Sequence, residues 1–122
     1  MIEIRLAKEA VTAGENIAGV ACWISQGESK PPEAFVVKVG WVVEGRAGFE
    51  MNTLFEKKEV PAAPGMPIQI AFDVPTPPEG PISYDGELVR VIWRVFATAE
   101  ISWAIDPKKE VPVRVLPRKV ER

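Results

Sequence analysis

Apolar and polar side chains alternate along most of this chain. In residues 35–44 nearly every odd position is apolar, and the even positions include Lys38. Residues 89–103 repeat the pattern, with apolar odd positions and with Arg90 and Arg94 on the opposite face. Because side chains of a β-strand point alternately to the two faces of a sheet, this alternation predicts long strands that each bury one face.

Shorter segments continue the pattern between turn sequences rich in proline and glycine. Residues 2–6, 68–74 and 111–115 alternate in the same way. Residues 16–24 are apolar on both faces, which is expected of a central strand or of one covered by a partner.

Residues 48–60 form the weakest of these segments. Their alternation slips near Thr53 and Leu54, where one extra residue in the strand would restore the phase. We therefore expect a β-bulge at this point. Pro112 is a second irregularity: a proline removes a backbone donor, so it predicts an edge strand or another bulge.

Strands separated by regular turns, without helical periodicity, are typical of a β-sandwich. The sequence therefore predicts an all-β fold, an antiparallel immunoglobulin-like β-sandwich of about seven strands. No linker or repeat divides the chain. We expect a single domain over residues 1–122, with roughly the last five residues frayed.

A proline-rich connection, residues 75–81, precedes the longest predicted strand. Its four prolines stiffen a segment that must cross from one part of the sandwich to another. The sequence Asp85-Gly86 then supplies a turn, because glycine tolerates a positive φ. Ser83 is expected to satisfy a backbone group in this turn.

Four short motifs in the chain resemble those of a known superfamily. A Gly-Glu pair and a following glycine open one strand, an aromatic-containing strand ends in proline, and a Pro-x-Ser-aromatic-x-Gly turn leads into a strand of the form Arg-x-x-aromatic-x-Val-x-Ala. The residues that carry these motifs are Gly14, Glu15, Gly19, Phe72 to Pro75, Pro81, Ser83, Tyr84, Gly86, Arg90, Trp93, Val95 and Ala97. In them the chain resembles the amino-terminal domain of arrestin-like proteins, a superfamily that includes arrestins, an arrestin-shaped subunit of retromer and bacterial sporulation-control proteins.

This resemblance implies a binding or scaffolding module without catalytic activity. It covers most of the chain and is sharpest over residues 65–105. Arrestin-like proteins usually carry two such sandwiches in tandem, whereas this sequence has one. The positive cluster with which true arrestins sense phosphate has no visible match here, so receptor and phosphate recognition are not carried over.

Charge and composition narrow the range of partners. A net charge of −2 and a pI of about 5.3 provide no basic field, so we expect no nucleic-acid partner. No long apolar run or secretory pattern is present, which predicts no membrane insertion and a cytoplasmic protein. Twelve prolines against few Asn and Gln match a balance reported for heat-adapted proteins.

Candidate catalytic groups are scarce. The chain has no histidine, the commonest general base and metal ligand, and Cys22 is its only cysteine. Cys22 lies in an apolar strand, where a thiol acts as a small hydrophobic group. We therefore expect no enzyme, no cofactor and no metal site.

Two alternatives remain open. A carbohydrate- or small-ligand-binding sandwich would need aromatic rings side by side on an exposed face. The alternation instead places Trp41, Trp93 and Trp103 in the core, while Trp23 fits either the core or an interface because its strand is apolar on both sides. A small enzyme would need polar groups that converge in a deep pocket.

The remaining polar positions indicate where a partner would dock. The candidate interaction surface consists of Trp23, Lys38, Arg90, Arg94 and Arg114, and Arg5 has the same outward parity. This face is either a solvated charged surface or a docking surface for an acidic protein. A partner could also add a strand to an exposed edge, formed by residues 48–60 or by the first or last strand. We expect the partner to be another protein, and a second copy of the chain is one candidate because a lone sandwich would leave apolar surface bare.

Overall fold

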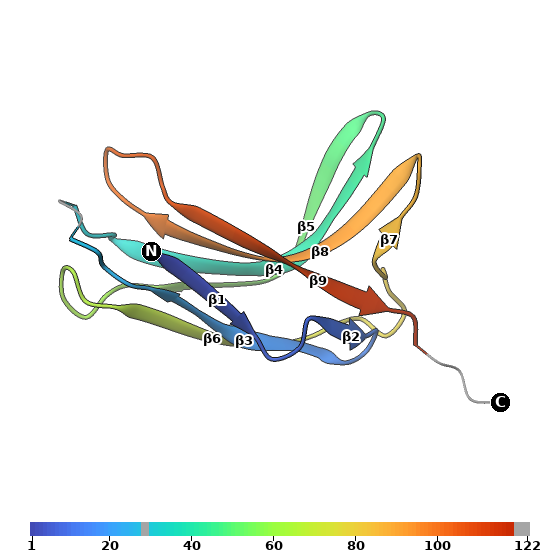
Figure 1. Ribbon diagram of the computed structural model, residues 1–122, viewed down its shortest axis with the longest axis horizontal. Helices are drawn as coiled ribbons and strands as arrows, with labels where there is room; N and C mark the ends of the chain where they lie inside the picture. Colours follow the sequence, from blue (N-terminus) through green and yellow to red (C-terminus); the bar gives the residue numbers. More distant parts are fainter. Residues whose placement is uncertain (28–29, 119–122) are drawn as a thin grey trace.

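The computed structural model describes residues 1–27 and 30–118, which form two β-sheets packed against each other (Figure 1). The strands in these residues are β1 (Ile2–Leu6), β2 (Ala10–Thr12), β3 (Asn16–Trp23), β4 (Ala34–Gly45), β5 (Gly48–Glu59), β6 (Ile68–Pro75), β7 (Tyr84–Asp85), β8 (Val89–Glu100) and β9 (Lys108–Leu116). The expectation of a frayed C-terminus falls on residues 118–122, of which 119–122 lie outside the described residues. No helix in the described part of the chain has the length and apolar character needed to cross a membrane.

The smaller sheet has the strand order β1-β3-β6, and the larger sheet has the order β2-β9-β8-β4-β5, with β7 paired to β8. Every strand pairing is antiparallel except the parallel pairing of β2 with β9. The all-β sandwich expected from the alternation is confirmed. The structure has more strands than expected because β2 and β7 have only three and two residues, too few to produce a periodic pattern.

The core lies between the two sheets and is built from alternate positions of the strands. Its largest fully buried side chains are Trp93, Phe35, Ile17, Ile70, Val37, Val39, Val95, Val113 and Val115. The residues of β4, β6, β8 and β9 among them have the inward parity that the sequence predicts. Trp41 is only half-buried and packs on Trp93, with ring centroids 4.9 Å apart.

The bulge expected in β5 is present. Val39 of β4 pairs with Phe55 and the next residue, Gly40, pairs with Thr53, so Leu54 is the extra residue. Gly40 lies so close to β5 that an added Cβ would stand 2.0 Å from a carbonyl oxygen of that strand. Beyond this point the β4–β5 hairpin bends away from the smaller sheet (Figure 1), in the way that bulges bend strands.

The proline-rich connection crosses from β6 in the smaller sheet to β7 and β8 in the larger one, as expected. Thr76 anchors its start: the buried hydroxyl donates to the carbonyl oxygen of Glu15 at 2.6 Å and accepts from the amide of Gly14 at 2.9 Å. Ser83 anchors its end, because its hydroxyl accepts from the amide of Val115 at 2.8 Å. The expectation that Ser83 satisfies a backbone group is confirmed.

Replacing Thr76 with valine is expected to lower the free energy of unfolding by roughly 1–3 kcal/mol, because the amide of Gly14 and the carbonyl oxygen of Glu15 would both lose the Thr76 hydroxyl as a partner. Urea denaturation monitored by tryptophan fluorescence measures this change. Thr98→Val on the outer face of β8 is the matched control and should change stability by less than about 0.5 kcal/mol. Equal effects of the two substitutions would show that the Thr76 hydroxyl does not tie the connection to the β2–β3 turn.

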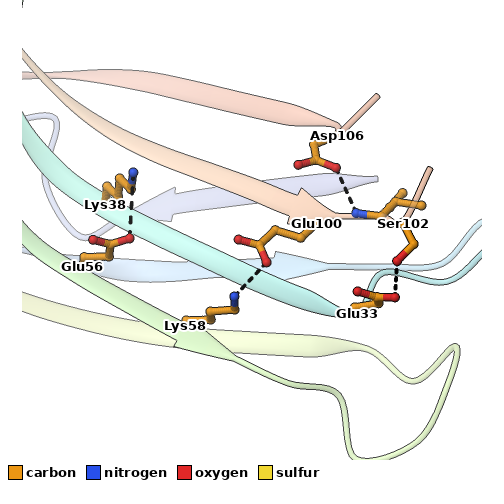
Figure 2. Close-up of polar contacts among 8 residues, drawn as sticks. Glu33, Lys38, Glu56, Lys58, Glu100, Ser102 and Asp106 are labelled. Atoms are coloured by element: carbon orange, nitrogen blue, oxygen red, sulfur yellow. Dashed lines mark hydrogen bonds and ion pairs between the residues drawn. The ribbon is translucent and has the colours of Figure 1, made fainter. Parts of the chain in front are cut away.

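The strand predicted over residues 89–103 ends at Glu100 instead. The chain turns there, because the amide of Ile101 donates to the Asp106 carboxylate at 2.9 Å (Figure 2). Trp103 lies in this turn with φ of 59° and is 97% exposed. The prediction that Trp103 is a core residue is therefore wrong, since alternation that runs on through a turn cannot be told from a strand by its pattern alone.

Candidate interaction surface

The outer face of the larger sheet carries three of the predicted surface residues, namely Lys38 on β4 and Arg90 and Arg94 on β8. Each of the three forms an ion pair. The ion pairs on this face are Lys38–Glu56 at 3.8 Å, Lys58–Glu100 at 2.9 Å, Arg90–Asp85 at 2.9 Å, Arg90–Glu44 at 3.6 Å, and Arg94–Glu110. Figure 2 shows the first two, which join β4 to β5 and β5 to β8 across the sheet.

These pairs make the face charge-balanced. Lys38 lies directly opposite Glu56 in the strand register, and Arg90 lies opposite Glu44. The hydrogen bond and the negative charge of Glu100 raise the pKa of Lys58 above its ordinary value. Exposed pairs of this kind contribute only about 0–1 kcal/mol each. The face therefore has little net positive charge to attract an acidic partner. The sequence pattern located the cations of this face but could not locate the acids beside them.

Arg114 lies at the edge of the same sheet, where it lines a hollow together with Asp85 and Arg90 and also lines a groove between β1 and β9. This groove has a volume of 470 Å³ and is lined by Ile4, Leu6, Glu9, Val111, Pro112 and Arg114. Its floor is apolar, since Ile4, Leu6 and Val111 pack against the core. Within the described residues Arg114 forms no ion pair within 4 Å. Among the predicted surface cations, Arg114 therefore has a charge that can pair with a group bound in this groove.

Two strand edges border the groove. β1 pairs only with β3, and in this antiparallel ladder the backbone groups of Ile2, Ile4 and Leu6 point away from β3. β9 pairs with β8 over residues 108–113, and it meets β2 on its other side only from Arg114 onward. The described strands thus leave the outer edge of β1 and much of one edge of β9 without a ladder. Pro112 lies on that edge of β9, as its sequence position predicted.

Two predicted surface residues lie in other places. Trp23 is 2% exposed and belongs to the core between the sheets, so its inclusion in the interaction surface is wrong. It is a core residue because its register partners Ile2 and Ile68 also point inward. Arg5 lies on β1 in the smaller sheet, apart from the other arginines. Its hydrogen bond to Glu3, at 2.7 Å, raises the pKa of its guanidinium above the ordinary value.

The only cysteine and two acids of the loops and strands lie apart in the structure. Cys22 is half-buried on the outer side of β3, with its Sγ 3.8 Å from the carbonyl oxygen of Glu3. Asp73 accepts a hydrogen bond from Asn16 on the smaller sheet, whereas Asp85 pairs with Arg90 on the larger one.

The exposed aromatic residues are separated too. Phe49 and Tyr84 lie near the same end of the larger sheet but on opposite faces, since Phe49 is opposite Glu44 and Tyr84 is opposite Val91 in the strand register. Trp103 lies beyond the other end, after β8. The described exposed rings therefore form no side-by-side platform of the kind that stacks on sugars.

A comparison with solved structures supports the fold described above. A solved structure of Spo0M, a sporulation control protein from Bacillus subtilis, matches this chain with a TM-score of 0.64 and 18% sequence identity. The match covers 96% of this chain and 49% of that one, so the chain spans about half the length of the Spo0M structure. No protein-family model matches the sequence, and no curated protein matches it. The chain has an arrestin-like fold, as its sequence motifs indicated.

Proposed function

We propose that this chain is a non-catalytic protein-interaction module that holds an extended segment of a partner protein in the groove between β1 and β9. The observation that carries the proposal is the pair of strand edges that face one apolar groove. An added strand would satisfy backbone groups of β1, β9 or both. Such binding would suit a regulatory role like that of Spo0M, a sporulation control protein.

The side chains of the groove define the segment that fits best. Apolar residues at alternate positions of the segment would pack on Ile4, Leu6 and Val111, because side chains of a strand alternate between its faces. An acidic residue would pair with Arg114, and a basic residue would pair with Glu9. A lone carboxylate beside a guanidinium suits recognition better than acid–base catalysis, which supports a module without enzymatic activity or cofactor.

The proposed partner is a protein of the same compartment, which we take to be the cytoplasm. A second copy of the chain is included among the candidates, since its own β1 or β9 edge could add to the groove. Nucleic acid is not an expected partner, because the ion pairs on the larger sheet leave no broad basic surface there.

Selection of a random peptide library on the immobilised chain tests the proposal. We expect enriched peptides with alternating apolar residues and an acidic residue, and we expect Arg114→Glu to weaken their binding by about tenfold. Lys38→Glu, on the charge-balanced outer face and away from the cavities that Arg114 lines, is the matched control and should change binding less than twofold. Light scattering of the chain alone reports whether a second copy occupies the groove. A failure to enrich any peptide from a chain that is monomeric at high concentration would contradict the proposal.

A further inference from the structure

Large apolar side chains are exposed together at one end of the sandwich, which we call the loop end. The loop end comprises the N-terminal residue, the described residues 24–27 and 30–33 of the β3–β4 connection, and the β5–β6 and β8–β9 connections. The strand register brings these segments together: Phe35 at the start of β4 pairs with Glu59 and Ala99, and Trp23 at the end of β3 pairs with Ile2 and Ile68. In Figure 1 the β5–β6 and β8–β9 connections and the described parts of the β3–β4 connection lie at the same extreme of the long axis. The exposed apolar residues of the loop end are Met1, Ile24, Val60, Met66, Trp103 and Ile105.

Two of the connections are almost without charge. Residues 60–67 read VPAAPGMP and contain no charged side chain. Residues 101–107 read ISWAIDP, and their one acid, Asp106, accepts a hydrogen bond from the amide of Ile101. Trp103 and Ile105 are 97% and 95% exposed, so they project from the turn instead of packing on the sheet. Trp103 also has a positive φ, a conformation that costs energy for a large residue and is common where a side chain is held in place for binding.

The described acids Glu33 and Glu100 of the loop end have polar partners, whereas Lys108 and Lys109 have none among the described residues. Glu33 accepts a hydrogen bond from the hydroxyl of Ser102, and Glu100 pairs with Lys58 (Figure 2). Lys108 and Lys109 begin β9, are exposed, and have no ion pair among the described residues.

The two lysines lie beside the apolar side chains. A cavity of 320 Å³ lined by both lysines also includes Met1, Trp23 and Ile101. The loop end therefore combines projecting apolar residues with adjacent, uncompensated positive charge.

We propose that the loop end docks on the surface of a lipid bilayer that contains anionic lipids, with Trp103 and Ile105 inserted at the interface. The exposed apolar residues come from separate segments at one end of the molecule, so a flat deformable surface can meet them together. Tryptophan favours the region between lipid headgroups and acyl chains, and lysines beside it attract anionic headgroups.

This proposal departs from the absence of membrane insertion expected from the sequence. That expectation rested on net charge and on the lack of a long apolar run. The residues of the loop end come from four separate parts of the chain, so only the strand register brings them together. The proposal concerns shallow docking through loops. It does not depend on the proposed binding of a partner segment in the groove between β1 and β9.

Co-sedimentation with phosphatidylcholine vesicles, with and without phosphatidylserine, tests the proposal. We expect binding to the phosphatidylserine vesicles and a blue shift of the tryptophan emission. Trp103→Ser combined with Ile105→Ser should abolish both. Lys108→Glu combined with Lys109→Glu should weaken binding at least about tenfold, because each lysine near an anionic surface contributes roughly fivefold to the binding constant.

Phe49→Ser is the matched control, since Phe49 is 78% exposed at the opposite end of β4 and β5 and should leave vesicle binding unchanged. Equal binding by the Trp103/Ile105 variant and the unaltered chain would overturn the proposal. So would the absence of binding to either vesicle. If the Trp103/Ile105 variant instead loses self-association in light scattering, the loop end is a protein interface and the proposal is wrong.

Discussion

Replacing Trp93 with alanine is expected to lower the free energy of unfolding by about 4 kcal/mol. Trp93 is the largest fully buried side chain and lies at the centre of β8, where it pairs with Trp41 of β4 and Val113 of β9. Its indole Nε1 donates to the carbonyl oxygen of Pro81 at 3.0 Å, so it also fixes the end of the proline-rich connection. The substitution would open a cavity between the sheets and leave that carbonyl without its donor. Since domains of this size are stable by only about 5–15 kcal/mol, much of the protein should unfold in mild denaturant.

Urea denaturation followed by far-ultraviolet dichroism measures this effect without depending on tryptophan emission. Trp93→Phe separates the two causes, because phenylalanine keeps most of the volume but has no donor for Pro81. It should cost less than half of the loss seen with alanine. A Trp93→Ala variant as stable as the unaltered chain would mean that the two sheets do not share the core described above.

The sequence pattern was sufficient to predict the fold because burial in this protein is periodic. In β6 and over much of β4, β8 and β9 the side chains that the alternation assigns to the core are the ones that the structure buries. The exceptions lie toward strand ends: Val89 of β8 is 42% exposed, and Val36 and Val42 of β4 are buried despite their outward parity. Even an interruption was informative, since the slip near Leu54 corresponds to the bulge opposite Val39 and Gly40. The alternation gave missing or wrong predictions in segments that do not form a long strand. β2 and β7 are too short to alternate, and Trp103 continues an apparent strand into a turn that Asp106 closes.

The interaction surface was less predictable because it depends on which strands are neighbours. Parity placed Lys38, Arg90 and Arg94 on an outer face but could not reveal the acids opposite them. Arg5 has the same parity and lies on the other sheet.

The groove and the loop end are also products of topology. The groove needs β1 and β9 to come together, although they lie at opposite ends of the sequence, and β1 packs close to β9 without forming a ladder with it. The loop end needs three connections to reach the same side of the molecule (Figure 1). The sequence does contain the charge-free segment VPAAPGMP and the adjacent lysines Lys108 and Lys109, but only the strand register shows that these two segments lie at the same end of the sandwich.

The second large effect is expected at Gly40, where replacement by alanine should lower the free energy of unfolding by about 3 kcal/mol. An added Cβ would stand 2.0 Å from the carbonyl oxygen of Asn52 and 3.0 Å from the Cα of Thr53. Both are backbone atoms of the bulged strand, so no side-chain rotation can relieve the overlap. The strands would have to separate at the bulge, and the ladder between β4 and β5 would be broken on at least one side of it.

Gly45→Ala is the matched control, because the same substitution at the end of β4 places a Cβ 3.6 Å from the nearest atom, the carbonyl oxygen of Leu88. It should change stability by less than about 1 kcal/mol, and the smaller unfolded-state entropy of alanine could even make it stabilising. Amide hydrogen exchange distinguishes a local from a global effect of Gly40→Ala: faster exchange confined to β5 would locate the damage at the bulge. If Gly40→Ala and Gly45→Ala had the same effect, the close approach of β4 and β5 at the bulge would not exist in solution.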